Sequence, residues 1–354
     1  MQVCGYYNIQ RMCGNTFRAE NTLEINKENQ PNHKATVHLI CCIKPRQLLI
    51  MFFTSPDARL LSMSIIKVKD RAGVSLLLRQ VGDVRIPPAY SEEVLREVPK
   101  LALREDDIIL LGWMRSGTHW TYEMICMLIN NNTETIRKKK EEDMIEFVPH
   151  STLDNTPSPR VLNTHLLFHQ MPEDLKTEKI KVVFLLRDPR DAIVSWHRMQ
   201  TLLPHYEYKG AWKDWFPLCI YGELDWGSWF DYVRDWEREL PKHPNLDVYF
   251  WYYEDMKKNP VDELRKLAEF LCIRVNEDLL RAVVDKCHLE RMRKDKLPYE
   301  WLMGGKNSHY HKGSVGGWKE VFTVKQYEEF ENVYRQKMAG SIFEDRYKGS
   351  VQVL

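Results

Sequence analysis

The chain has 354 residues, of which 44% are hydrophobic, and its formal net charge at pH 7 is +1. A chain of this length can bury a large core, and its near-neutral charge gives no reason to expect nucleic-acid binding. Its eight cysteines form no C-x-x-C pair and no metal-binding spacing, which indicates reduced thiols and a cytoplasmic location.

Residues 1–75 lack clear periodicity, and we expect them to form an N-terminal extension of uncertain order. Their apolar stretch, Val37 to Phe53, is interrupted by Lys44, Pro45 and Arg46 and is therefore a poor membrane span. The N-terminus also lacks the basic region and apolar core of a secretion signal. We expect no membrane partner.

A buried strand, a glycine-bounded loop and a helix are predicted between Asp107 and Leu128. Four apolar residues lead into the sequence GWMRSGTHW, and Trp120, Met124 and Leu128 then share one helical face. Backbone amides at such a turn favour bound phosphate or sulfate. A nucleotide kinase loop would continue with Lys and Ser or Thr where this chain has Thr118 and His119, which argues against a magnesium-dependent kinase.

The next charged run, Arg137 to Lys140 followed by Glu141 to Asp143, is interpreted as a solvated face. After it, the short apolar run of PRVLNTH ends at His165. An imidazole with an ordinary pKa near about 6.5 suits proton removal from a hydroxyl at neutral pH. His165 is therefore the candidate base.

A second buried strand is predicted from Val182 to Arg187, with Pro189 opening a helix. Arg187 lies at the carboxyl end of this strand, where open α/β sheets bind their ligands. Ser195 follows eight residues later, a little over two helical turns, so the two side chains can converge on one anion.

The C-terminal third continues the strand and helix pattern. Asp247 to Tyr252 is a predicted strand, and Asn259 with Pro260 opens a predicted helix. A glycine-broken loop from His309 to Thr323 then precedes a helix whose start carries a capping box, Thr323 with Gln326.

Together these segments resemble the cytosolic sulfotransferase family, over roughly residues 86–346. WMRSGTHW is similar to that family's Y-P-K-S-G-T-T-W, RDPRDAIVS to R-N-P-K-D-x-x-V-S, NTH to K-T-H, and HKGSVGGW to R-K-G-x-x-G-D-W. The resemblance implies an α/β fold, a single domain with a central parallel sheet flanked by helices, related to P-loop NTPases. It places a sulfotransferase catalytic domain in residues 76–354.

The resemblance also implies the reaction, which is sulfuryl transfer from 3′-phosphoadenosine 5′-phosphosulfate to a hydroxyl or amine without a metal. His165 would be the base, with Arg115 and Asn163 beside it at the reacting centre. The residues implied to bind the nucleotide are Arg115, Ser116, Gly117, Thr118, His119, Trp120, Arg187, Ser195, Tyr253, His311, Lys312 and Gly313.

The chain departs from the family pattern at four of these motif positions. Arg115 replaces a Lys, Asn163 replaces the Lys of K-T-H, His311 replaces an Arg and Gly317 replaces an Asp. Arginine keeps the charge but not the geometry of lysine, whereas asparagine brings no charge. A non-catalytic homologue that only binds the nucleotide therefore remains the alternative to an active enzyme.

The acceptor and the oligomeric state are the last expectations. The acceptor pocket is expected to be apolar and to suit a small lipophilic phenol, alcohol or steroid, with candidate lining residues Phe147, Phe168, His169, Trp196 and Met199. KEVFTVKQYE matches the family's dimer motif K-x-x-x-T-V-x-x-x-E at Lys319, Thr323, Val324 and Glu328, which favours a homodimer.

Overall fold

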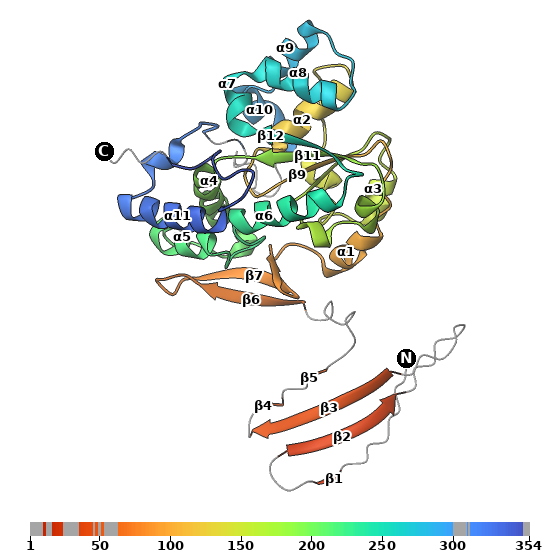
Figure 1. Cartoon of the computed structure of the whole chain (residues 1–354), viewed down its shortest axis with the longest axis vertical. Coiled ribbons are helices and arrows are strands. Elements are labelled where there is room, and N and C mark those ends of the chain that lie inside the picture. Colours follow the sequence, from red (N-terminus) through yellow and green to blue (C-terminus); the bar gives the residue numbers. More distant parts are fainter. Residues whose placement is uncertain are drawn as a thin grey trace, which may run out of the picture. The chain divides into compact units, whose positions relative to one another are not determined.

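The computed structural model describes residues 63–299, 310 and 312–349, together with the backbone of five short strands between Gln10 and Phe52. The chain divides into two compact units, Met1–Ser62 and Met63–Leu354 (Figure 1). The strands of the first unit pair antiparallel and are β1 Gln10–Arg11, β2 Thr16–Leu23, β3 Ala35–Lys44, β4 Gln47–Leu48 and β5 Met51–Phe52.

A four-stranded parallel sheet forms the centre of the second unit, in the order β10-β9-β11-β12. Its strands are β9 Ile108–Gly112, β10 Val161–Thr164, β11 Lys181–Leu186 and β12 Asp247–Tyr252. All five residues of β9 are buried, as expected for a continuous apolar run in a sheet covered on both faces. The predicted central parallel sheet is confirmed.

Helices cover both faces of this sheet (Figure 1). Because side chains alternate along a strand, Ile109 and Leu111 of β9 enter one hydrophobic core with α4 Pro189–Leu202, α6 Trp229–Glu239 and α11 Val324–Lys337. Ile108 and Leu110 enter the other core, with α2 Thr118–Ile129, α8 Pro260–Phe270 and α9 Glu277–Lys286.

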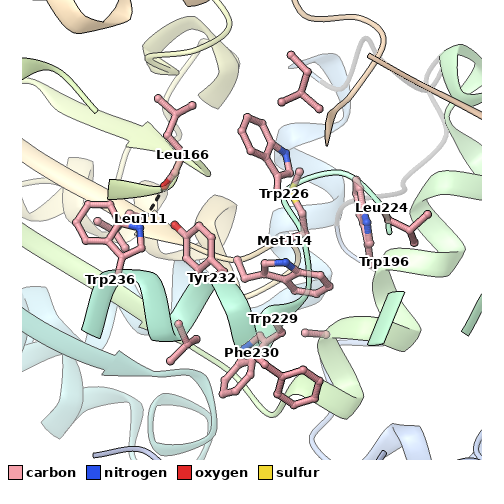
Figure 2. Close-up of a cluster of buried hydrophobic side chains, with 14 of the residues drawn as sticks. Leu111, Met114, Leu166, Trp196, Leu224, Trp226, Trp229, Phe230, Tyr232 and Trp236 are labelled. Atoms are coloured by element: carbon pink, nitrogen blue, oxygen red, sulfur yellow. Dashed lines mark hydrogen bonds between the residues drawn. The ribbon is translucent and has the colours of Figure 1, made fainter. Parts of the chain in front are cut away.

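The first core is rich in aromatic side chains. Figure 2 shows Tyr232 and Trp236 of α6 close to Leu111 of β9 and Leu166, and Trp229 beside Met114. The indole Nε1 of Trp236 donates a hydrogen bond of 3.1 Å to the carbonyl of Leu166. Large aromatic side chains dominate the energetics of such cores, so α6 fixes the position of the chain that leaves β10.

The other elements of this unit surround the sheet. A small antiparallel sheet contains β6 Met63–Lys69, β7 Ser75–Val81 and β8 Val84–Ile86. The remaining α-helices are α1 Glu92–Glu97, α3 His150–Asp154, α5 Trp212–Ile220, α7 Tyr253–Lys258 and α10 Leu289–Lys296. Short 3₁₀ turns include η3 Lys140–Asp143, η4 Phe168–Gln170, η6 Pro204–Tyr206 and η10 Gly317–Glu320. No helix within the described part of the chain is long and apolar enough to cross a bilayer.

Two helix starts test the local sequence signals. Thr323 caps α11, as predicted. Both hydrogen bonds of the capping box are present, since each of Thr323 and Gln326 accepts with its side chain from the backbone amide of the other. Pro260 occupies the first turn of α8, also as predicted, but the side chain of Asn259 forms no capping hydrogen bond. Proline and the apolar face therefore define the start of α8 without help from an asparagine side chain.

A buried ion pair joins the amino ends of β9 and β10. Arg160 donates to both carboxylate oxygens of Asp107, from Nε at 2.8 Å and from Nη2 at 2.5 Å, and neither side chain is exposed. A further donation to the carbonyl of Ala102, at 2.8 Å, satisfies the guanidinium. This pair holds the two strands in parallel register at the end where both strands begin.

Replacing Asp107 by Asn should destabilise the protein strongly, because the buried charge of Arg160 would keep only the longer pair with Asp154, at 3.7 Å. The expected loss is about 3–5 kcal/mol of unfolding free energy, measured by urea denaturation. The matched control is Asp262→Asn, which removes the exposed pair with Arg265 and should leave the unfolding midpoint unchanged. A loss below about 1 kcal/mol in Asp107→Asn would contradict this role of the pair.

Candidate functional site

Three loops meet at the carboxyl edge of the central sheet. The strands β9, β10 and β11 are parallel neighbours, so the residues that follow them lie at one edge. Arg115, His165 and Arg187 come from these three loops and line a single cavity of about 670 Å³. The size is typical of a small-molecule site.

The loop after β9 has a backbone conformation that requires its glycines. Gly117 has a φ of +104°, and a Cβ there would lie 3.0 Å from Cδ2 of Tyr253. A Cβ on Gly112 would lie 2.9 Å from the carbonyl oxygen of Leu185. The chain can therefore turn tightly from β9 into α2, which leaves the first amides of the helix available to an anion.

Buried polar atoms of the loop region are also left without partners. Among the described residues, Ser116 Oγ and Arg187 Nε accept or donate no hydrogen bond. Buried polar groups are normally paired, so these two atoms are suited to a bound polar ligand. Thr118, the first residue of α2, is buried at the same turn.

Arg187 and Ser195 converge, as the sequence predicts, and in this structure both contact Arg115. Arg187 Nη1 donates to the carbonyl of Arg115 at 2.9 Å, and Arg115 Nε donates to Ser195 Oγ at 2.9 Å. Arg115 itself has a φ of +66°, which is uncommon for a residue with a side chain. The three residues thus form a positively charged end of the cavity.

An aromatic group adjoins this charged end. Trp120 meets Tyr253 edge to face with ring centroids 5.7 Å apart, and its Nε1 donates to the carbonyl of Cys287 at 2.9 Å. The guanidinium carbon of Arg187 lies 4.4 Å from the centre of the Tyr253 ring. These side chains offer flat surfaces on which an aromatic base can pack.

The C-terminal loop contributes Lys312 and Gly313 to the cavity lining. Lys312 is exposed and forms an ion pair with Glu320. Gly313 has a φ of +60°, and a Cβ there would lie 3.1 Å from Leu289. The predicted ligand His311 lies outside the described residues.

His165 is buried at the end of β10, with 7% of its surface exposed. Its Nδ1 lies 2.7 Å from the carbonyl oxygen of Gly112. Because a carbonyl only accepts, Nδ1 carries the proton and Nε2 is the nitrogen that can accept one. Burial and, as a smaller effect, the positive charge of Lys140 lower the pKa of His165 to about 3, so the imidazole is neutral at pH 7.

Glu146 lies directly behind His165 and was not expected from the sequence. The backbone amide of His165 donates to Glu146 Oε1 at 2.7 Å, and burial raises the pKa of Glu146 to about 7. No local pattern marks this carboxyl, because it comes from the segment between η3 and α3 and reaches the site only through the fold.

The expectation of a solvated face from Arg137 to Asp143 is wrong for two of its residues. Lys140 is 4% exposed and Asp143 is 3% exposed, although Arg137 and Glu142 are exposed. The segment runs beside the edge strand β10, where Ile145 donates to the carbonyl of Asn163 at 3.1 Å. Tertiary pairing therefore buries charges that the sequence pattern places in water.

Asn163, the predicted partner of the base, is fully buried and does not line the cavity. Its Nδ2 donates to the carbonyl of Lys140 at 2.9 Å, and its Oδ1 accepts a hydrogen bond from Lys140 Nζ. Lys140 lines the cavity instead. Asn163 thus holds a lysine at the site.

His119 lies at the same wall of the cavity. Its Nε2 is 3.0 Å from Glu141 Oε1, and its ring meets that of Tyr310 edge to face at 6.3 Å. The described residues contain no group of three or more His, Cys, Asp or Glu side chains arranged to hold a metal ion.

The other end of the cavity is apolar. Three predicted acceptor-pocket residues, Phe147, Trp196 and Met199, line it. Further lining residues come from other segments that no sequence pattern marks, and these include Tyr90, Met144, Leu203 and Tyr206. The Tyr206 hydroxyl donates to the buried carboxylate of Asp225 at 2.6 Å.

The structure places the other two predicted pocket residues elsewhere. Phe168 packs against Trp236 at 5.2 Å and stacks on His243 at 4.6 Å between ring centroids, while His169 is exposed. Neither is among the residues that line the cavity. The reason is that the chain turns into η4 directly after His165 and Leu166, so these side chains leave the sheet edge.

The predicted dimer motif forms an exposed surface. Lys319 lies in η10, and Thr323 caps α11. Val324 is 76% exposed, and Val315 and Val321 are also exposed apolar side chains of this region. Glu328 follows on α11 and is exposed.

Comparison with known proteins agrees with this geometry. Residues 105–342 match a family model described as "Sulfotransferase domain". Sulfotransferase 1B1 of Mus musculus is 31% identical over 67% of this chain and 84% of its own length, and sulfotransferase 1C2 of Homo sapiens is 27% identical over 76% and 95%. The crystal structure of mouse sulfotransferase SULT7A1 complexed with PAP is 28% identical, covers 77% of this chain and 98% of its own, and superimposes with a TM-score of 0.67.

The matched region contains all four strands of the parallel sheet and every residue that lines the cavity except Pro87, Ala89 and Tyr90. The family model alone spans more than half of the chain. The chain therefore belongs to the sulfotransferase family.

Proposed function

We propose that this protein transfers a sulfuryl group from 3′-phosphoadenosine 5′-phosphosulfate to a hydroxyl or amine of a small lipophilic acceptor. The observation that carries the proposal is the meeting of an anion-binding loop and a buried, neutral His165 in one cavity. Membership of the sulfotransferase family supports it, as does the similar mouse enzyme that was solved with PAP. PAP is adenosine 3′,5′-bisphosphate, the nucleotide product of such a transfer.

The residues of the cavity fit this nucleotide. The loop from Arg115 to Thr118 presents amides at the start of α2, and the unpartnered Ser116 Oγ and Arg187 Nε can bind phosphate oxygens. Trp120 and Tyr253 provide the aromatic surface for adenine. When bound, the nucleotide supplies an electrophilic sulfur with a phosphate leaving group.

The chain's own residues supply proton transfer and positive charge. His165 Nε2 can accept the acceptor's proton, because Nδ1 is held in its protonated form by the carbonyl of Gly112. Arg115 brings a permanent positive charge to the loop that faces the leaving phosphate. No metal is part of this mechanism.

The acceptor proposed here is flat and lipophilic, such as a phenol, an alcohol or a steroid. Aromatic and thioether side chains line the end of the cavity beyond His165, among them Phe147, Trp196 and Met199. Such a surface favours apolar ring systems.

The family resemblance also supports a cytosolic location.

Replacing His165 by Gln should reduce sulfuryl transfer by about 10²–10⁴-fold, because a positioned general base contributes about that much. The measurement is transfer from labelled 3′-phosphoadenosine 5′-phosphosulfate to a panel of phenols, alcohols and amines, with nucleotide binding followed by calorimetry. Nucleotide affinity should be retained.

The matched control for this variant is His243→Gln, since His243 stacks on Phe168 outside the cavity. Equal rates in wild type and His165→Gln would exclude His165 as the base. Nucleotide binding without transfer to any acceptor in the wild type would favour the non-catalytic homologue.

The pH dependence of His165 gives a second prediction. Its pKa is lowered from 6.5 to about 3, so the free enzyme should keep a neutral imidazole from pH 8 down to pH 5. The unfolded chain binds this proton near pH 6.5, whereas the folded chain does not, so His165 reduces stability as the pH falls through 6.5. The pKa of Glu146 is raised to about 7. Protonation of Glu146 therefore increases stability as the pH falls through 7.

Imidazole nitrogen shifts measured by NMR test this prediction, with the His165 signals assigned from the His165→Gln spectrum. The His165 signals should not titrate between pH 5 and 8. A midpoint near 6.5 would show that the His165 imidazole is in contact with water and that burial does not lower its pKa.

We also propose a homodimer formed through the surface of Lys319, Thr323, Val324 and Glu328. Its support is the match to the family's dimer motif and the exposure of three valines in this region, Val315, Val321 and Val324. Isolated exposed apolar residues are common, but a contiguous group often marks an interface.

The change Val324→Asp should convert the dimer to a monomer in sedimentation-velocity experiments. Val324 is the first residue of α11, where a negative charge favours the helix, so folding should be retained. Ile342→Asp, at a site that is 71% exposed, is the control and should leave the oligomeric state unchanged. A monomeric wild type, or a dimeric Val324→Asp variant, would overturn this interface.

A further inference from the structure

We infer that Lys140 is a catalytic residue, whose ammonium group binds the oxygens of the transferring sulfuryl group beside His165. The inference rests on the proposed sulfotransferase function and adds a residue to it. The charged run predicts a solvated position for Lys140, but the residue lies buried in the wall of the cavity.

The fold brings Lys140 to the carboxyl end of β10. This strand is at the edge of the sheet, and the segment after η3 runs beside it, with a parallel bridge between Met144 and Asn163. Asn163 then holds Lys140 by two hydrogen bonds, one to its carbonyl and one from its Nζ. The ammonium position is therefore fixed by the sheet.

Lys140 and His165 are on the same side of the chain that leaves β10. Asn163 and His165 are two residues apart, and such residues point to the same face of a strand. Both Lys140 and His165 line the cavity. The positive charge of Lys140 also acts on the imidazole, since it helps to lower the pKa of His165.

The ammonium group is poorly compensated. Burial lowers the pKa of Lys140, although the nearby carboxylates of Glu141, Glu146 and Asp143 favour its charged form. Within residues 63–299 and 312–349, no carboxylate forms an ion pair with it, and Asn163 Oδ1 is the one acceptor that its Nζ reaches. An ammonium has three donors, and a buried charge is costly unless it is paired.

Lys296 shows what a structural buried lysine looks like in the same molecule. It is 6% exposed, but its Nζ forms an ion pair with Glu123 at 3.0 Å and donates to the carbonyl of Ile136 at 2.7 Å. It is not among the residues that line the cavity. Lys296 is therefore satisfied by the protein, whereas Lys140 is suited to an incoming anion.

The role of Lys140 in the reaction is electrostatic. The acceptor oxygen forms a bond to sulfur, its proton passes to His165 Nε2, and the bond between sulfur and the phosphate oxygen breaks with its electron pair leaving on the phosphate. Throughout this exchange the sulfuryl oxygens carry negative charge. A fixed ammonium beside them stabilises that charge at a site where water is excluded.

The sulfuryl group distinguishes the two nucleotides, because adenosine 3′,5′-bisphosphate lacks it. In Lys140→Met, we expect affinity for 3′-phosphoadenosine 5′-phosphosulfate to fall by about tenfold or more, the size of a lost charged hydrogen bond. Affinity for adenosine 3′,5′-bisphosphate should change by less than about twofold. Calorimetry without acceptor measures both affinities, so the result does not depend on turnover.

Two further variants separate charge from folding. Lys296→Met should lower the urea midpoint but leave the ratio of the two affinities unchanged. The double variant Lys140→Met with Asn163→Lys should restore the wild-type ratio, because it returns an ammonium to the same end of β10. If Lys140→Met does not fold, Lys140→Gln takes its place, since it keeps a donor to Asn163 without the charge.

Equal losses for both nucleotides in the Lys140 variants would overturn the inference and make Lys140 a structural residue. Unchanged affinities for both nucleotides in those variants would overturn it as well. The proposed function fails separately, when the wild-type protein binds neither nucleotide and transfers no sulfuryl group.

Discussion

Parallel pairing of β9 with both β10 and β11 is the constraint on which the site depends. The apolar runs of these strands must be buried, and the sheet with helices on both faces buries them completely. Because all three strands run in the same direction, the loops after them meet at one edge. The anion-binding loop, the base and the cation of Arg187 are brought together by this geometry.

Much of this arrangement could be predicted from local sequence. Strands β9, β11 and β12, the turn into α2 and the capping box of α11 follow from short patterns of apolar residues, glycines and capping side chains. The placement of Arg187 and Ser195 at one cavity was also predictable, since Arg187 follows β11 directly and Ser195 lies in the next helix, α4. What the pattern could not show is that both contact Arg115.

The residues that sequence analysis missed reach the site through long-range packing. Lys140 and Glu146 come from a segment that runs beside the edge strand β10, and a run of charged residues resembles a solvated surface until that pairing is known. Tyr206 and Asp225 meet in a similar way. Phe168 and His169 show the converse error, because nearness in sequence to His165 does not place them in the cavity when the chain turns away. The lowered pKa of His165 has the same origin, since burial depends on the whole fold.

The most direct test of this account is a crystal structure of the protein bound to adenosine 3′,5′-bisphosphate. The 5′-phosphate should lie on the backbone amides between Arg115 and His119, the adenine against Trp120 and Tyr253, and the 3′-phosphate near Arg187 and Ser195. His165 should then face the 5′-phosphate end. Nucleotide bound away from the carboxyl edge of the parallel sheet would contradict the central claim that this edge is the sulfotransferase site.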